Sequence, residues 1–202
     1  MKFLMAGAKG QAKDLLGGFQ YENHISGITL FDDYSKDLGD SLYGKYPIIN
    51  NLDSAEVYFR EVSPFFIAAI ASPPKRKGVV EKLKKIGGIN FSFIGSESCV
   101  SRYTEISEEG VIIQMRCEIS SGVKIDRGVL LNVKNIIGND VTIGEYTTLA
   151  PDVLVLSGAS IGTNCIISTG VTIMPGIKIG NNVKVWMNKV VDKDLPDNTN
   201  FI

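Results

Sequence analysis

The sequence predicts two kinds of structure in one chain, a small parallel α/β domain over residues 1–93 and a parallel β-helix over residues 94–202. In the first part, apolar runs of strand length alternate with stretches of helical spacing, which is typical of a parallel sheet covered by helices. Beyond residue 95 the helical spacing ends, and an aliphatic residue recurs every six positions. These two observations define the fold class and the domain boundary.

The first part is expected to begin with a strand, a glycine turn and a helix. Leu15, Leu16 and Phe19 give the helical spacing after the turn, and the pair Pro73-Pro74 suits the first turn of a later helix. The predicted strands cover residues 2–6, 28–31, 64–71 and 91–94, and the predicted helices cover residues 11–19 and 75–85.

The six-residue repeat fills twelve consecutive positions with aliphatic side chains. A second series of small or β-branched residues precedes it by two positions, with Asn135 and Thr147 as polar exceptions. A period of six matches neither the strand period of two nor the helical 3.6, but it suits a coil whose flat faces each use one hexad. The aliphatic positions are Ile119, Ile125, Leu131, Ile137, Ile143, Leu149, Val155, Ile161, Ile167, Ile173, Ile179 and Val185.

Glycine and asparagine residues are expected to turn the chain between these faces. Glycine directly follows the aliphatic residue at Gly138, Gly144, Gly162 and Gly180, where it permits a turn. The expected asparagine partners are Asn139, Asn164, Asn181 and Asn182. The repeat extends back to Val100 and Ile106, with a slip of one residue near Ile112 that predicts a small bulge.

Composition excludes several classes of partner. Lys and Arg number 21 against 22 Asp and Glu, so no basic surplus favours nucleic acid or an anionic membrane surface. No apolar run reaches the length of about 20 residues that crosses a bilayer, and the N-terminal apolar run is too short for a signal peptide. We therefore expect a cytoplasmic protein without nucleic-acid or membrane partners.

The three cysteines lack the spacing of a metal site or a redox pair. Cys99, Cys117 and Cys165 are expected to be buried, reduced thiols. The single histidine, His24, is expected on the surface of the first domain.

The repeat and the α/β domain before it resemble, over nearly the full chain, the left-handed β-helix acyltransferases with hexapeptide repeats. The chain is most similar to bacterial enzymes that acetylate the 4-amino group of UDP- or dTDP-linked 4-amino-4,6-dideoxy sugars, and to the sialic acid O-acetyltransferase branch. The resemblance implies a left-handed coil, a homotrimer with active sites between subunits, and acetyl-CoA or another acyl-CoA as cosubstrate. It also implies a role in surface polysaccharide or glycan biosynthesis. The γ-type carbonic anhydrases share the scaffold, but their zinc needs three histidines, so no metal is expected here.

The resemblance places a nucleotide-sugar site in the first domain. The glycine turn falls on Gly7, Lys9, Gly10 and Gln11, where backbone N–H groups approach a phosphate or a base, although a tight strand–helix turn needs glycine in any case. The pair Asp32-Asp33 matches the acids that hold the base or ribose; the alternative is a pair of solvated turn residues. Residues Ala71, Ser72, Lys75 and Arg76 match the region near the nucleotide phosphates, with a solvated helix face as the alternative.

The family's catalytic histidine and its acidic neighbour fall on Asn139 and Asp140 when Ile143-Gly144-Glu145 is matched to the family motif. The usual general base is therefore missing. A hydroxyl acceptor needs a base as it attacks, whereas a neutral amine attacks first and loses its proton later. Asn139 would then orient the amine and Asp140 would accept the proton, which favours an amine acceptor. The alternative is that Asn139-Asp140 is a turn.

The acyl-CoA site implied by the resemblance consists of Thr148, Ser157, Thr169 and Met187. The segment Trp186-Met187-Asn188 stands where the family has a Gly-x-Gly stretch. Its larger side chains are expected to reshape or narrow the CoA groove; alternatively, Trp186 stacks on the adenine of CoA. Two hypotheses follow. One is an acyl-CoA-dependent sugar N-acyltransferase, and the other is a catalytically impaired trimeric homologue that binds a nucleotide sugar or partners an active paralogue.

Overall fold

The computed structural model describes all 202 residues. The chain forms two compact units, one of residues 1–71 and 75–91 and one of residues 72–74 and 92–202. The second unit therefore begins two residues before the boundary placed after residue 93 in the sequence, and it includes a short segment at residues 72–74.

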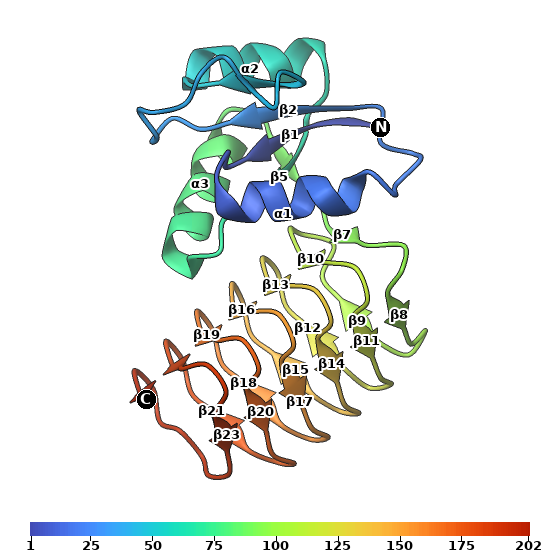
Figure 1. Cartoon of the computed structure of the whole chain (residues 1–202), viewed down its shortest axis with the longest axis vertical. Helices are drawn as coiled ribbons and strands as arrows, with labels where there is room; N and C mark the ends of the chain where they lie inside the picture. Colours follow the sequence, from blue (N-terminus) through green and yellow to red (C-terminus); the bar gives the residue numbers. More distant parts are fainter. The chain divides into compact units, whose positions relative to one another are not determined.

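The first unit is built on a six-stranded sheet with the strand order β3-β4-β2-β1-β5-β6 (Figure 1). All neighbouring strands are parallel except β3 and β4. From β1 the chain adds strands on one side of the sheet and then returns to add β5 and β6 on the other. The carboxyl ends of β1 and β5 thus form a switch point, which is where open α/β sheets bind ligands. The strands are β1 (Lys2–Ala6), β2 (Gly27–Phe31), β3 (Ser41–Leu42), β4 (Tyr46–Ile49), β5 (Phe65–Ala68) and β6 (Ile89–Asn90).

Three helices belong with this sheet, α1 (Gly10–Phe19), α2 (Leu52–Glu61) and α3 (Pro73–Lys85). The expected helices are confirmed in α1 and α3, whereas α2, β3 and β4 were not expected from the sequence. Helix α2 has a recognisable start, because the Asn51 side chain accepts a hydrogen bond from the Ser54 N–H at 2.9 Å. The predicted strand at residues 64–71 is shorter, since β5 ends at Ala68.

The second unit is a parallel β-helix made of three sheets (Figure 1). Consecutive coils pair in register, as where Ile119 pairs with Ile137 and Ile137 with Val155. The first sheet contains β7 (Phe93–Ile94), β10 (Ile112–Ile113), β13 (Leu130–Leu131), β16 (Thr148–Leu149), β19 (Ile166–Ile167), β22 (Lys184–Val185) and β24 (Asn200–Phe201). The second contains β8 (Cys99–Val100), β11 (Glu118–Ile119), β14 (Ile136–Ile137), β17 (Leu154–Val155), β20 (Thr172–Ile173) and β23 (Val190–Val191). The third contains β9 (Glu105–Ile106), β12 (Lys124–Ile125), β15 (Thr142–Ile143), β18 (Ser160–Ile161) and β21 (Lys178–Ile179).

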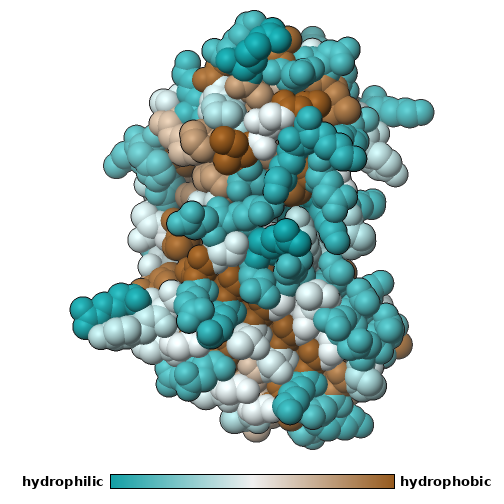
Figure 2. Space-filling model, turned by 180° about the vertical axis from the view of Figure 1, so that it is seen from behind, coloured by the Kyte–Doolittle hydropathy of each residue, from teal (hydrophilic) through white to brown (hydrophobic).

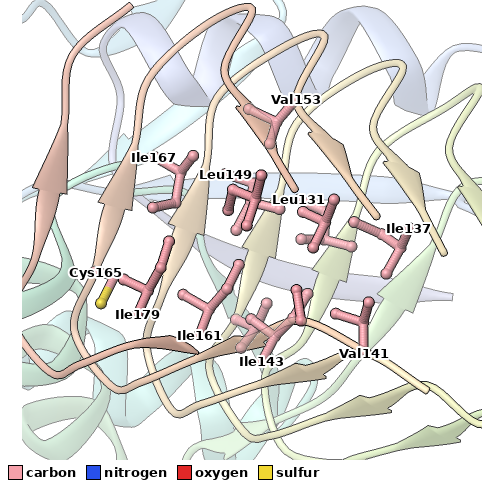
Figure 3. Close-up of a cluster of buried hydrophobic side chains, with 14 of the residues drawn as sticks. Leu131, Ile137, Val141, Ile143, Leu149, Val153, Ile161, Cys165, Ile167 and Ile179 are labelled. Atoms are coloured by element: carbon pink, nitrogen blue, oxygen red, sulfur yellow. The ribbon is translucent and has the colours of Figure 1, made fainter. Parts of the chain in front are cut away.

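The repeated aliphatic residues form the core of the β-helix. All twelve are buried, and Figure 3 shows several of them, including Ile143, Ile161 and Ile179, stacked from coil to coil. The two polar exceptions are satisfied inside the coil. The Asn135 amide donates to the Asn132 carbonyl at 2.6 Å and accepts from the Val153 N–H at 3.0 Å. The Thr147 hydroxyl donates to the Gly162 carbonyl at 2.7 Å and accepts from the Cys165 N–H at 3.0 Å.

The one-residue slip predicted near Ile112 is confirmed. Ile106 pairs with Ile125, nineteen residues on, whereas Ile113 pairs with Leu131, eighteen residues on. The extra residue therefore lies in the corner between β9 and β10, which also contains Gly110 at a φ of +70°. The last coil is shorter, because Val185 pairs with Phe201, only sixteen residues on.

The corners show that the turn role given to four glycines was wrong. A left-handed φ occurs at every sixth residue from Gly110 to Asn188, which is three residues after each aliphatic position rather than one. Glycine is required at these four positions for a different reason, which is the lack of room for a Cβ against the next coil. A Cβ on Gly162, for example, would lie 2.6 Å from the Gly180 carbonyl oxygen, and the other three positions are Gly138, Gly144 and Gly180. Of the four asparagines, Asn164 and Asn182 have the left-handed conformation, and Asn139 and Asn181 do not.

Cys117 and Cys165 are buried as expected, but Cys99 is exposed, because it is the outward-facing first residue of β8. Burial raises the pKa of the Cys117 thiol to about 11. His24 lies on the surface, as predicted. None of the helices combines the length and the apolar character needed to cross a membrane.

Candidate functional site

A pocket of about 510 Å³ lies at the carboxyl ends of β1, β2 and β5 in the first unit. Seven of the residues assigned to nucleotide-sugar binding from the sequence line it: Gly7, Lys9, Gly10, Gln11, Asp32, Asp33 and Ala71. Ser72 and Arg76 do not line this pocket, and Ser72 belongs to the segment that groups with the second unit.

The glycine turn forms one wall of the pocket and fixes the start of α1. Gly7 has a φ of +105°, and a Cβ there would lie 2.7 Å from the Ala69 carbonyl oxygen, so only glycine fits between β1 and β5. The space around the Gly10 α-carbon is open. Helix α1 has no side-chain cap and no acidic residue in its first turn. Its first N–H groups and the positive end of its dipole are thus suited to an anion.

Asp32 uses its carboxylate to join the glycine turn to the segment after β2. Its Oδ2 accepts hydrogen bonds from the Ala8 N–H at 3.3 Å and the Ser35 hydroxyl at 3.2 Å. Its Oδ1 accepts from the N–H groups of Tyr34 at 3.1 Å and Ser35 at 2.8 Å. Both oxygens are therefore occupied by the protein's own donors.

Asp33 differs from its neighbour because its carboxylate has a side-chain partner across the pocket. The Lys82 ammonium group lies 2.6 Å from Asp33 Oδ2. Lys75, about two turns before Lys82 on α3, places its ammonium group 5.4 Å from the centre of the Tyr34 ring. The pocket thus combines three lysines, at positions 9, 75 and 82, with the two carboxylates of Asp32 and Asp33, and its apolar wall is formed by Phe31, Ile70 and Val79.

Lys82 and Tyr34 were not singled out in the sequence. Lys82 follows Lys75 by seven residues, a spacing that places two side chains on the same face of a helix. Because a helix was expected over this segment, the spacing could have predicted that Lys82 faces the same side as Lys75. Arg76, which was singled out, is buried and donates hydrogen bonds from Nη1 to the carbonyl oxygens of Ile70 at 2.6 Å and Ala71 at 3.1 Å. It holds the chain just after β5.

Asn139 and Asp140 form the corner between β14 and β15, and both side chains are exposed in the single chain. Asp140 has a φ of +61°, and its N–H donates to the Ser121 carbonyl at 3.1 Å. The Asn139 carbonyl accepts from the Gly158 N–H at 2.8 Å. Ser157 occupies the same corner one coil later, so the structure brings this acyl-CoA candidate close to the candidate catalytic pair.

The other acyl-CoA candidates lie elsewhere on the β-helix. Thr169 and Met187 occupy consecutive coils of a different corner, where the Asn188 N–H donates to the Thr169 carbonyl at 2.9 Å. Thr148 is buried in β16. The structure therefore places Thr169 beside Met187 but on another corner from Ser157. The adjacent Trp186 is 49% exposed and donates its indole N–H to Asn200 Oδ1 at 3.1 Å.

A shallow cavity of about 440 Å³ lies on the third sheet of the β-helix, over Gly144, Gly162 and Gly180. These are the glycines whose missing side chains allow close stacking of successive coils. The sequence singled them out as turn residues and gave no signal for a cavity. No group of three or more histidine, cysteine or acidic side chains is arranged to hold a metal ion.

Sequence comparison finds the repeat directly. Residues 158–193 match the sequence model of the bacterial transferase hexapeptide family (six repeats). Residues 158–193 of the β-helix thus carry bacterial transferase hexapeptide repeats. This match agrees with the resemblance to hexapeptide-repeat proteins seen in the sequence. A search of curated proteins finds no significant match.

Solved structures with the same fold cover nearly all of this hexapeptide-repeat protein. PerB from Caulobacter crescentus, in complex with CoA and GDP-perosamine, has a TM-score of 0.85 and 20% identity, over 98% of this chain and 91% of that one. A His-to-Asn mutant of perosamine N-acetyltransferase from Caulobacter crescentus, with the same ligands, has a TM-score of 0.86 and 21% identity over 98% and 91%. The acetyltransferase domain of PglB from Neisseria gonorrhoeae has a TM-score of 0.87 and 20% identity over 98% and 94%. The predicted fold, an α/β domain followed by a left-handed β-helix, is confirmed.

Proposed function

We propose that this hexapeptide-repeat protein transfers an acyl group, in the first place acetyl, from acyl-CoA to the amino group of a nucleotide-linked amino sugar. The observation that carries the proposal is the pocket at the switch point of the α/β sheet, in a chain whose other unit is a hexapeptide β-helix. A protein of the same two-part fold has been solved with CoA and GDP-perosamine together. The proposed acceptor is a 4-amino-4,6-dideoxy sugar, and GDP joins UDP and dTDP as a candidate carrier.

The pocket supports the nucleotide part of the proposal. Its volume of about 510 Å³ falls within the range of small-molecule sites, roughly 300–1,000 Å³. The uncapped start of α1 and the lysines at positions 9, 75 and 82 suit a diphosphate, while the Asp33 carboxylate suits hydroxyl or N–H donors of the nucleoside.

The β-helix corner supports an amine as nucleophile. The neutral amine nitrogen attacks the thioester carbonyl carbon, the C–N bond forms, the C–S bond breaks, and CoA leaves as a thiolate. Asn139 orients the amine, and Asp140 takes the surplus proton and passes it to the thiolate. No histidine is needed for the attack itself. The solved His-to-Asn mutant shows that one protein of this fold holds both ligands with such a replacement.

A homotrimer in the cytoplasm completes the proposal. In the single chain the corner at Asn139 and Asp140 is open to solvent, so a neighbouring subunit would have to close the site. The outward face of the second sheet carries exposed apolar side chains at Ile136 and Val190, with exposures of 46% and 57%, and Met174, directly after β20, is 38% exposed. Figure 2 shows hydrophobic surface along the β-helix. Light scattering during gel filtration should give three times the chain mass of 22.0 kDa.

The test is an acyl-transfer assay that follows thiol release from acetyl-CoA with a panel of UDP-, dTDP- and GDP-linked 4-amino sugars. We expect turnover with at least one sugar, a large loss in Asp140→Asn, and unchanged turnover in Glu145→Gln. Glu145 is a matched control, because it is an acid of the same coil that pairs with Arg127 at a different corner. Absence of turnover together with absence of CoA binding by calorimetry would exclude the enzyme.

The alternative is a catalytically impaired homologue that still binds a nucleotide sugar. The observation in its favour is that the only histidine of the chain is His24, outside the β-helix. The variant Asn139→His distinguishes the active N-acyltransferase from the impaired homologue. Turnover that arises only in this variant supports the impaired homologue, whereas comparable turnover in the wild type supports the enzyme.

A further inference from the structure

All three lysines of the pocket contact one short segment after β2, residues 33–37, which we call the strap. We infer that the Asp37 carboxylate of the strap competes with the phosphates of the ligand for the Lys9 ammonium group, so that nucleotide binding exchanges these partners and releases the strap. The inference rests on the proposed function and deepens it, because it names a built-in competitor that sets how tightly a diphosphate binds.

The strap is tied to both sides of the pocket. On the α3 side, the Asp33 carboxylate and the Tyr34 ring contact the two pocket lysines of that helix. On the side of the glycine turn, the Lys9 ammonium group donates to both oxygens of Asp37, at 2.7 and 3.0 Å. The positive charges that we assign to the diphosphate are therefore engaged by groups of the protein itself.

The contact between Lys9 and Asp37 is the one that a ligand replaces most easily. The two side chains are 54% and 74% exposed, whereas those of Lys82 and Asp33 are 40% and 22% exposed. Water screens an exposed ion pair, which therefore contributes little to stability. The hydrogen bond from Lys9 holds the pKa of Asp37 below its ordinary value. At neutral pH the competition for Lys9 is thus between two anions.

Lys9 is placed to serve either partner. It is the N-cap residue of α1 and directly precedes the first N–H groups of that helix, which suit a phosphate. The flexible stem of a lysine lets its ammonium group turn from one anion to another without a change in the backbone. A phosphate on α1 gains Lys9 and the helix N–H groups together, while the exposed Asp37 returns to water. The exchange therefore favours the phosphate.

Release of Asp37 should loosen one defined stretch of the chain. Asp32 fixes two N–H groups of the strap, and the Asp40 carbonyl accepts a hydrogen bond from β4 at 3.0 Å. Between these two anchors, residues 36–39 are tied to the glycine turn by the Asp37 side chain. The effect should therefore be confined to residues 36–39.

Calorimetric titration of the wild type and its variants with UDP, GDP and dTDP tests the inference. Asp37→Asn removes the competing charge, so a nucleotide that binds the wild type should bind this variant about two- to five-fold tighter. Lys9→Gln should weaken binding, and Asp37→Asn should then give no further gain, because the exchange needs both partners. The matched control is Asp14→Asn, the same charge change at an exposed position of α1 outside the pocket lining, which should leave affinity unchanged.

Hydrogen exchange followed by mass spectrometry locates the effect in the chain. Nucleotide binding to the wild type should speed amide exchange at residues 36–39, and Asp37→Asn should show this faster exchange by itself. Slower exchange there on binding would overturn the inference, as would equal affinity of the wild type and Asp37→Asn, or an equal gain in the Lys9→Gln background. Each of these results leaves the proposed function standing. Failure of all three nucleotides to bind overturns the proposed function itself.

Discussion

The carboxylate of Asp140 lies against the bare α-carbon of Gly122, one coil earlier at the same corner of the β-helix. A Cβ on Gly122 would lie 3.2 Å from the Asp140 carboxyl carbon and closer still to its Oδ1. Asp140 can therefore keep its position only because residue 122 has no side chain. This contact connects the packing of the coil to the proposed chemistry.

Gly122→Ala should displace the Asp140 side chain and reduce acyl transfer as Asp140→Asn does. It should also destabilise the fold, since alanine at a φ of +75° costs about 1–2 kcal/mol before any clash. The matched control is Gly176→Ala, at the same corner with a φ of +71° and nothing within 4 Å. Denaturant midpoints and thiol-release rates of both variants separate backbone strain from the contact. Equal activity in the two variants would show that the Asp140 position is unimportant.

Thr147→Val should destabilise the β-helix although it changes the side-chain volume little. The variant leaves the Gly162 carbonyl and the Cys165 N–H without the threonine hydroxyl, and each buried unsatisfied group costs about 1–3 kcal/mol. Thr142→Val is the control, because Thr142 is exposed on β15 and a surface change stays within about 0.5 kcal/mol. The two free energies of unfolding are compared in urea. A similar midpoint for both variants would contradict the role given to the Thr147 hydroxyl.

The β-helix could be predicted from the sequence because every coil needs apolar side chains at the same inward positions, which produces the six-residue repeat. Each inward position must be apolar, so the period of six and even the slip before Ile112 were visible. The glycines were misread because glycine serves two purposes that look alike in sequence. A left-handed φ is a local property, whereas the lack of room at Gly162 depends on Gly180, eighteen residues away.

The candidate site was predictable only in part, for a related reason. The glycine turn and the acid pair lie in contiguous motifs, so they could be found. The contrast between Asp32 and Asp33 depends on partners from other segments, namely Ala8 and Lys82. Helix α2 was overlooked although Asn51 caps it and Ala55, Tyr58 and Phe59 have helical spacing.

The stability of the protein should fall as pH rises through the range between 9 and 11. Burial raises the pKa of Cys117 from its ordinary 9.0 to about 11, so the native state keeps a proton that the unfolded state releases. Because the native state then binds more protons, the free energy of unfolding decreases with pH, by about 3 kcal/mol once the pH has passed both pKa values. Urea unfolding at pH 8 to 10.5 should show a shallower decline in Cys117→Ala. An equal decline would contradict the assignment.

Gly7 and Gly10 should respond in opposite ways to the same substitution. Gly7→Ala combines a φ of +105° with a Cβ only 2.7 Å from the Ala69 carbonyl oxygen, so it should lose about 2 kcal/mol of stability or more. Gly10→Ala places its methyl group in open space at the first residue of α1, so stability should hold or rise by up to about 0.5 kcal/mol.

Nucleotide affinity completes the contrast between the two glycines, since the open space at Gly10 is where a phosphate would reach the first N–H groups of α1. Gly10→Ala should therefore weaken nucleotide binding in calorimetry while its thermal midpoint stays at or above that of the wild type. A variant that binds nucleotides as well as the wild type would place the phosphate elsewhere in the pocket. No atom of the fold occupies the space that the methyl group of Gly10→Ala would fill. If Gly10→Ala lowers nucleotide affinity without lowering stability, the methyl group must therefore obstruct the nucleotide itself.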